Sequence, residues 1–217
     1  MITLNFGLFW AGKKLSFLRY LTFKTLREFH PTSRIELFWS NEYTGHGYSW
    51  NREKQDFEND AVVVDYMDKL KKINVEIVSC DIFKRYPPNY QSDFFRWWYL
   101  YNHGGFYLDN DQIILKPFDS LPLDNDMIYC SYGNYCPVGV IGAEKGSKNI
   151  KKIMKFLPSR YNPNDYNSLG PWMMRDVLGH LDSSRMYNAP QKFFYPIPFS
   201  DGIVSVYEGK FNIPKES

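Results

Sequence analysis

Short hydrophobic runs alternate with amphipathic stretches through the first half of the chain. Apolar runs of strand length occur at residues 2–10, 35–39 and 75–79, and each predicts a buried β-strand. Between them, residues 13–29 and 56–73 place apolar side chains at helical spacing. This β-α-β-α-β order predicts an α/β fold, in which helices cover a parallel sheet.

The second half mixes shorter elements with longer loops. Helices are predicted at residues 91–102, 147–157 and 172–181. Short strands are predicted at residues 106–108, 127–132, 138–143, 193–195 and 203–207. Residues 43–51 and 158–171 are rich in turn-forming residues and predict loops. No repeat or linker divides the 217 residues, which predicts one domain, free-standing or excised from a longer protein.

The chemistry concentrates in residues 92–119, SDFFRWWYLYNHGGFYLDNDQIILKPFD. Asp93 and Arg96 are three residues apart in a predicted helix, so they share a face. Asp109 and Asp111 follow an apolar strand and alternate with Asn110, so in an extended backbone both carboxylates point the same way. Two carboxylates at a strand end suit a hard divalent cation, Mn²⁺ or Mg²⁺, and such a cation can carry a diphosphate.

The order and spacing of eight residues resemble the S-D-x-x-R…G-G-x-Y-x-D-x-D pattern of the DXD-containing sugar-transferase family. That family includes yeast-type initiating mannosyltransferases, bacterial capsule enzymes and glucosylating clostridial toxins. The matching residues are Ser92, Asp93, Arg96, Gly104, Gly105, Tyr107, Asp109 and Asp111. Weaker echoes are Phe9-Trp10 with Gly12, Gly170-Pro171, and Tyr195-Pro196-Ile197. The resemblance implies the GT-A fold: a Rossmann-like mixed sheet, mostly parallel in its N-terminal half and flanked by helices.

The resemblance also implies an activity. The family moves a sugar from a nucleoside diphosphate sugar, with UDP or GDP as the nucleotide, to an acceptor hydroxyl on a glycan or glycoprotein, and retention of configuration is favoured. By resemblance, Asp109 and Asp111 bind the metal, while Asp93 and Arg96 hold the hydroxyls of the donor sugar. Tyr107 corresponds to a tyrosine that contacts the diphosphate or ribose. Asp93, Arg96, Asp109 and Asp111 are therefore the expected catalytic residues.

Further substrate contacts are expected from both halves of the chain. Residues 1–116 should bind the nucleotide sugar, because parallel strands present ligands at their carboxyl ends, and residues 117–217 should face the acceptor. The additional substrate-binding candidates are Phe9, Trp10, Asn41, Ser92, Asn110 and Trp172. For a third metal ligand the candidates are Asp201 and Ser205, and for the base of an inverting reaction they are Asp201 and Asp176.

A second Asp-Asn-Asp, at residues 124–126, lacks the preceding strand and the Gly-Gly turn and predicts only a surface turn. Two other functions fit parts of the pattern. A non-catalytic module that binds sugar nucleotides or glycans would not need both Asp109 and Asp111. A D-x-D phosphatase would carry its motif after the first strand and would want Thr or Val where this chain has Ile113. His103, at the end of a predicted helix, is expected to cap it as a protonated ring.

Composition narrows the partners and the location. The net charge is +2 with no long basic run, which gives no indication of a nucleic-acid partner. No apolar stretch is long enough for a membrane span, and the start lacks the basic residues of a signal peptide. The three cysteines form no C-x-x-C pair, which predicts reduced thiols in a cytoplasm. The chain resembles the compact soluble forms of the family in bacteria and large DNA viruses, so a bacterial or virus-infected host cytosol is expected.

Overall fold

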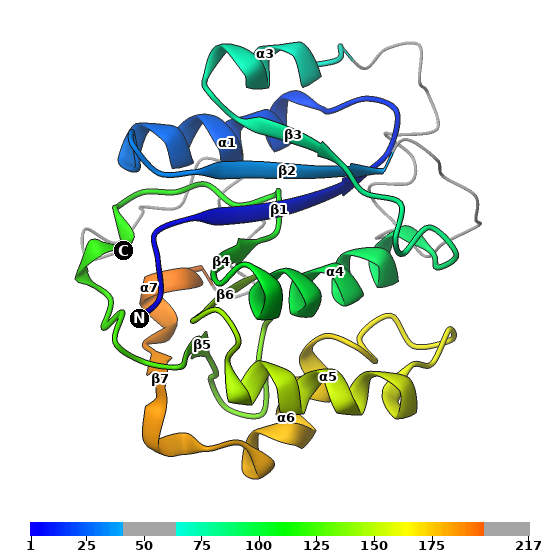
Figure 1. Ribbon diagram of the computed structural model, residues 1–217, viewed down its shortest axis with the longest axis vertical. Helices are drawn as coiled ribbons and strands as arrows, with labels where there is room; N and C mark the ends of the chain where they lie inside the picture. Colours follow the sequence, from blue (N-terminus) through cyan, green and yellow to red (C-terminus); the bar gives the residue numbers. More distant parts are fainter. Residues whose placement is uncertain (41–63, 198–217) are drawn as a thin grey trace.

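The computed structural model describes residues 1–40 and 64–197, and these form a seven-stranded mixed sheet (Figure 1). The strand order is β3-β2-β1-β4-β6-β5-β7. Strands β1, β2, β3 and β4 run parallel, β6 runs antiparallel to β4 and β5, and β7 is parallel to β5. The strands are β1 Phe6–Ala11, β2 Ile35–Ser40, β3 Glu76–Ser79, β4 Gly105–Leu108, β5 Met127–Cys130, β6 Val140–Ala143 and β7 Met186–Ala189. The predicted α/β fold, parallel in its N-terminal half, is confirmed.

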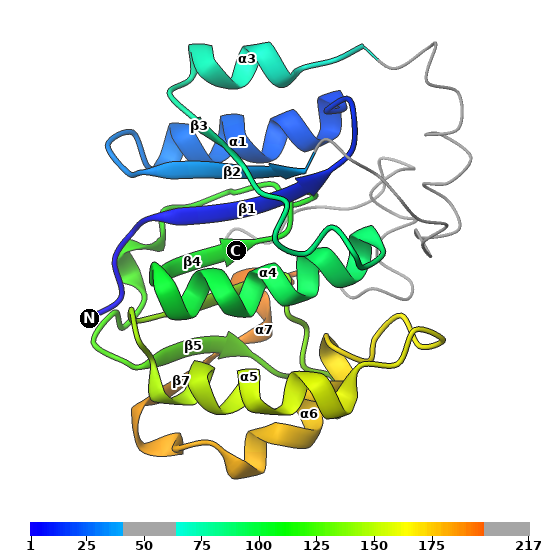
Figure 2. The same cartoon turned by 45° about the vertical axis from the view of Figure 1, so that its right-hand side comes forward.

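Helices cover both faces of this sheet (Figure 2). Helices α4, α5 and α6 pack on one face, where Trp97 and Tyr99 of α4 are fully buried. Helices α1 and α3 pack on the other, where Phe23 and Leu26 of α1 are fully buried. The helices are α1 Phe17–Phe29, α3 Met67–Lys72, α4 Pro88–Asn102, α5 Lys148–Arg160, α6 Pro171–Val177 and α7 Gln191–Phe194. None of the helices in the described residues is both long and apolar enough to cross a membrane.

The turn between α4 and β4 depends on two glycines. Gly104 and Gly105 have φ angles of 70° and 87°, a conformation that residues with a Cβ rarely adopt. A Cβ on Gly105 would lie 2.4 Å from the carbonyl oxygen of Asn5. The Gly-Gly pair therefore lets β4 enter the sheet tightly beside β1 and sets the position of Asp109 beyond the strand.

Three predictions about local structure are wrong. The strand expected at 193–195 is part of a helix instead, α7, and β7 was missed. Residues 124–126 do form a turn, but Asp126 is buried and accepts hydrogen bonds from Ser147 Oγ and two backbone amides at the start of α5. His103 ends α4 as expected, where its backbone N–H donates to the carbonyls of Tyr99 and Leu100, but burial, followed by nearby Arg34 and Lys145, lowers its pKa and so opposes the expected protonated ring.

Other predicted boundaries shift by a few residues. Helix α5 continues through Pro158 to Arg160, so the following loop starts later than predicted. In the described part of the helix predicted at 56–73, only α3 is helical. Several predictions lie outside the described residues: Asn41, Asp201, Ser205, the 43–51 loop, the 203–207 strand and the start of the 56–73 helix.

Candidate active site

Asp109 stands immediately after β4, at the carboxyl end of the parallel strands, and one of its oxygens is held by two donors. Its Oδ1 accepts a hydrogen bond from the Tyr107 hydroxyl at 2.6 Å and from Arg96 Nη2 at 3.1 Å. The Tyr107 hydroxyl also lies 2.7 Å from Ser92 Oγ. Residues from α4 and β4 therefore meet around one carboxylate, whose side chain is still 35% exposed.

Asp93 and Arg96 form a buried ion pair inside α4, as their spacing predicts. The Arg96 guanidinium also stacks 4.6 Å over the ring of Tyr107. Among the described residues, Arg96 Nε has no hydrogen-bond partner. Burial raises the pKa of Asp93 to about 6, although the charge and hydrogen bond of Arg96 lower it. Retaining two charged groups at such a depth is costly, which is typical of a functional site rather than of a stabilising core pair.

Tyr107 acts as a hydrogen-bond donor in this network. Burial, and then the neighbouring Asp109 carboxylate, raise the pKa of the Tyr107 hydroxyl well above its usual range. The hydroxyl therefore keeps its proton at neutral pH and donates it to Asp109. We name the four side chains Asp93, Arg96, Tyr107 and Asp109 the Arg96 cluster.

Two residues that the sequence did not single out as site residues close one side of Asp109. The Asp109 amide donates to the Gly139 carbonyl at 2.7 Å, and a Cβ on Gly139 would lie 2.7 Å from Asp109 Oδ2. Tyr195 accepts a hydrogen bond from the Val140 amide at 3.0 Å, and burial, followed by Asp109, raises the pKa of its hydroxyl. For these two residues, the only signal in the sequence was the weak family resemblance at Tyr195-Pro196-Ile197.

Asn110 and Asp111 form a turn, so the expected extended backbone at 109–111 is wrong. Asn110 is buried, donates to the Phe9 carbonyl at 3.0 Å and accepts from the Arg19 guanidinium. Its amide therefore ties β1 and α1 to the end of β4. Asp111 is exposed and accepts from Gln112 Nε2 at 3.0 Å. The turn places Asp111 at the surface, and the hydrogen bonds of Asn110 hold the turn in position.

The donor chemistry at this turn fits a divalent cation. Asp109 Oδ2 accepts no hydrogen bond from the described residues, and Asp111 supplies a second carboxylate beside it in sequence. Carboxylate oxygens are the ligands that Mg²⁺ and Mn²⁺ prefer. No group of three His, Cys, Asp or Glu side chains suited to a metal occurs within residues 1–40 and 64–197.

The aromatic residues expected near the nucleotide have different surroundings. Phe9 is buried in the core against Phe95, with ring centroids 5.2 Å apart. Trp10 is half-buried, donates from Nε1 to the Lys14 carbonyl at 2.9 Å, and carries the Arg19 guanidinium 4.3 Å over its ring. Arg19 was missed, although it occupies the buried stripe of α1 with Thr22, Phe23 and Leu26, where a charged residue is unusual.

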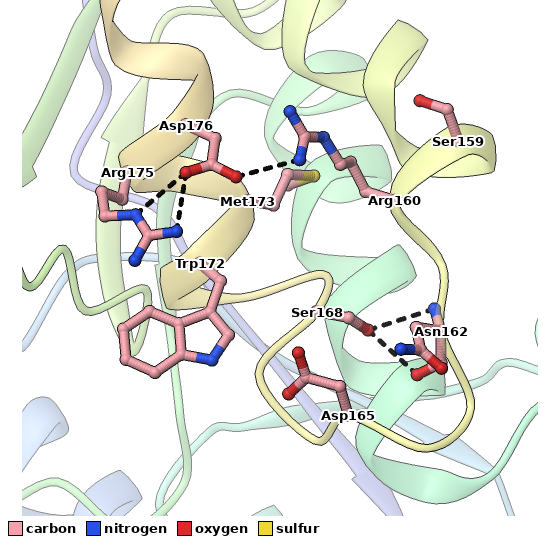
Figure 3. A pocket seen from close by; sticks show the side chains of 9 residues that line it. All are labelled: Ser159, Arg160, Asn162, Asp165, Ser168, Trp172, Met173, Arg175 and Asp176. Atoms are coloured by element: carbon pink, nitrogen blue, oxygen red, sulfur yellow. Dashed lines mark hydrogen bonds and ion pairs between the residues drawn. The ribbon is translucent and has the colours of Figure 1, made fainter.

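Trp172 lies at the start of α6, where its ring lines a pocket with Met173, Arg175 and Asp176 of the same helix (Figure 3). A Cβ on Gly170, which caps α6, would lie 3.7 Å from Asp93 Oδ1. The Trp172 ring meets Tyr135 edge-on at 6.1 Å, and Asp109 is close enough to contribute to the raised pKa of Tyr135, after burial. Asp176, a candidate base, is paired with Arg160 and Arg175. Trp172 and Asp176 both line one pocket.

Comparison with known proteins agrees with this geometry. Residues 19–128, just over half of the chain, match the family model described as "Glycosyltransferase sugar-binding region containing DXD motif". The structure titled PaToxG Glycosyltransferase is similar over 82% of this chain and 68% of its own, with a TM-score of 0.61 and 21% identity. The apo-form glycosyltransferase GlyE of Streptococcus pneumoniae TIGR4 is similar over 99% of this chain and 52% of its own, with a TM-score of 0.54 and 15% identity. These two structures share the fold. No curated protein sequence matches the chain.

Proposed function

The chain belongs to the family of DXD-containing glycosyltransferase sugar-binding regions, and we propose that it transfers a sugar from UDP or GDP to an acceptor hydroxyl with retention of configuration. The acceptor would be a glycan or glycoprotein. The Arg96 cluster is the observation that supports this best. Four side chains from α4 and β4 converge at the carboxyl end of the parallel strands, which is where α/β folds bind nucleotides.

Asp109 and Asp111 would hold Mn²⁺ or Mg²⁺. When bound, such a cation stabilises the negative charge that builds on the diphosphate leaving group. Arg96 and Tyr107 fix Asp109 Oδ1 in place through two hydrogen bonds, so the carboxylate is already oriented before a ligand arrives. Preorganisation of this kind lowers the cost of binding charge in the transition state.

Asp93 and Arg96 would read the donor sugar. The Arg96 guanidinium carries several N–H donors, of which Nε has no hydrogen-bond partner among the described residues. Asp93, paired with this guanidinium, presents acceptor oxygens next to it. Sugar hydroxyls both donate and accept, so a carboxylate next to a guanidinium suits them. Ser92 adds a hydroxyl to the same network.

The two halves of the chain would divide the substrates. Residues 1–116 carry the parallel strands and would bind the nucleotide, with Phe9 contributing through the core and Trp10 through its half-buried ring. Residues 117–217 would face the acceptor, with Trp172 among the contacts. A cytosolic location is proposed because Cys80, Cys130 and Cys136 are free thiols in the structure.

Donor hydrolysis by water tests this proposal. The full chain is incubated with UDP- and GDP-linked hexoses, with Mn²⁺ or with excess EDTA, and the released nucleoside diphosphate is measured. The proposal expects release from at least one donor with Mn²⁺ and none in EDTA. Nucleotide-sugar binding without any turnover, in the presence or absence of an added glycan acceptor, would instead indicate a non-catalytic binding module.

A further inference from the structure

A pocket of about 350 Å³ opens beside Trp172, between the end of α5, the 161–170 loop and the start of α6 (Figure 3). This volume falls in the range of about 300–1,000 Å³ that is typical of small-molecule sites. We name it the Trp172 pocket. Its lining is Ser159, Arg160, Asn162, Asp165, Ser168, Trp172, Met173, Arg175 and Asp176. The lining is mostly polar, which is unusual for a site that binds an apolar ligand.

The charges of the Trp172 pocket balance. Two guanidiniums, Arg160 and Arg175, face two carboxylates, Asp165 and Asp176. Asp176 binds both arginines, at 2.9 Å from Arg160 and 2.8 Å from Arg175. Figure 3 shows this carboxylate lying between the two arginines. A pocket with no net charge favours neither anions nor cations. Its arginine donors and aspartate acceptors can instead hydrogen-bond to the hydroxyl groups of a neutral ligand.

Trp172 supplies the other feature that carbohydrates use. Its ring is half-buried, lines the pocket and carries Arg175 at 5.1 Å. The negative face of an indole attracts the electropositive C–H groups of a sugar ring. The N–H provides a donor at the ring edge, so one side chain offers both kinds of contact.

Hydrogen bonds hold the 161–170 loop of the pocket in position. The Tyr90 hydroxyl of α4 donates to the carbonyls of Asn162 and Asp165 at 2.8 and 3.0 Å. Ser168 Oγ accepts from the Asn162 amide at 3.3 Å, and Asp165 Oδ1 accepts from the Asn167 amide at 3.0 Å. Because Tyr90 is on α4, the same helix anchors both the Trp172 pocket and the Arg96 cluster.

We propose that the Trp172 pocket binds a neutral sugar unit of the acceptor, adjacent to the unit whose hydroxyl receives the new sugar. This rests on the proposed function and specifies its acceptor as a glycan. Gly170 lies in sequence between the pocket residues Ser168 and Trp172, and a Cβ built on it would lie 3.7 Å from Asp93 Oδ1. This segment therefore connects the pocket to the proposed donor site.

The test uses ligand-observed NMR titration of the full chain in EDTA, without nucleotide. The probes are the methyl glycosides of glucose, galactose, mannose and N-acetylglucosamine, together with methyl glucuronide and an acetylated Ser/Thr peptide. At least one neutral glycoside should bind. Trp172→Ala should weaken that binding about three- to tenfold, the loss expected for an aromatic stacking contact, and Trp172→Phe should largely restore it.

Tyr166→Ala provides the matched control, because Tyr166 is an exposed aromatic residue of the same loop that does not line the pocket. It should bind glycosides like the unmodified chain. Thermal melting of each variant checks that it is folded. The inference is overturned if no neutral glycoside binds, if the glucuronide or the peptide binds instead, or if folded Trp172→Ala binds as before. Donor hydrolysis without glycoside binding would overturn only this inference. Glycoside binding without donor hydrolysis would overturn the proposed transfer reaction and leave a pocket that binds sugars.

Discussion

The chain contains the letters Asp-Asn-Asp twice, and the two copies differ in which carboxylate is held by the protein and which is exposed. At residues 109–111 the first carboxylate is held by Arg96 and Tyr107, the amide is buried and the last carboxylate is exposed. At residues 124–126 the first carboxylate is exposed, and the last is buried at the start of α5. The elements that flank a motif decide its role: β4 places one copy at the proposed cation site, and the other copy caps the start of α5.

Asp111→Asn should have the largest effect on activity. It removes one of two carboxylates proposed to hold the cation, and it leaves the fold intact because the side chain is exposed. Sugar transfer or donor hydrolysis should fall at least about 100-fold. The same change at the other copy, Asp124→Asn, should leave the rate unchanged. Equal rates for both variants would show that the first copy is also only a turn.

Arg96→Ala tests which part of the donor the cluster reads. Loss of a charged hydrogen-bonding partner should weaken binding of the nucleotide sugar by about 1.5–3 kcal/mol. Binding of the free nucleoside diphosphate should change much less. Calorimetric titration of both ligands measures the difference, after a melting curve shows that the variant is folded. Equal weakening would assign Arg96 to the phosphates instead of the sugar.

Asp126→Ala should act on stability rather than on activity. The carboxylate accepts from Ser147 Oγ and from the amides of Lys148 and Asn149 at the start of α5. Loss of such a cap costs about 0.5–2 kcal/mol, which lowers Tm by roughly 2–4 °C per kcal/mol in a chain of this size. Asp124→Ala should change Tm little. A large loss of activity in folded Asp126→Ala would contradict the division between the two copies.

Gly139→Ala should have a smaller, local effect at the first copy. Its Cβ would lie 2.7 Å from Asp109 Oδ2, so the carboxylate must shift by a few tenths of an ångström or more. Cation-dependent hydrolysis should slow while Tm changes little, because the Asp109 side chain is partly exposed. Gly133→Ala is the control, since a Cβ there meets no atom within 4 Å. Its kinetics should not change, although its positive φ is expected to lower Tm slightly. Unchanged kinetics in Gly139→Ala would show that Oδ2 takes no part.

Much of this fold could be predicted because the N-terminal elements are strongly periodic. The apolar runs of β1 and β2 and the amphipathic pattern of α1 specify parallel strands and a covering helix by themselves. The C-terminal half is harder. Residues 193–195 have strand-forming side chains, yet Pro190 starts a helical turn there and Phe194 is buried, so tertiary packing overrode the local preference.

The candidate site divides in the same way. The pairing of Asp93 with Arg96 could be predicted because helix spacing places them on one face, whereas Tyr107 and Asp109 were indicated by the family resemblance and by the apolar strand before Asp109. Gly139 and Tyr195 reach Asp109 only through the antiparallel pairing of β4 with β6 and through the segment after α7. Contacts between residues so far apart in sequence depend on the register of the sheet, which no local pattern specifies. The role of Asp126 was missed for the same reason, because its partners begin 21 residues later.

The most direct test of the cation site is a titration of UDP and GDP into the chain with and without MnCl₂. Unmodified chain and Asp124→Asn should bind at least one of these nucleotides markedly more tightly with Mn²⁺ than in EDTA. Asp111→Asn should show the same weak binding in both conditions. If Asp111→Asn kept the full Mn²⁺ dependence, or if the unmodified chain bound nucleotide equally well in EDTA, the assignment of residues 109–111 as a cation and diphosphate site would be wrong.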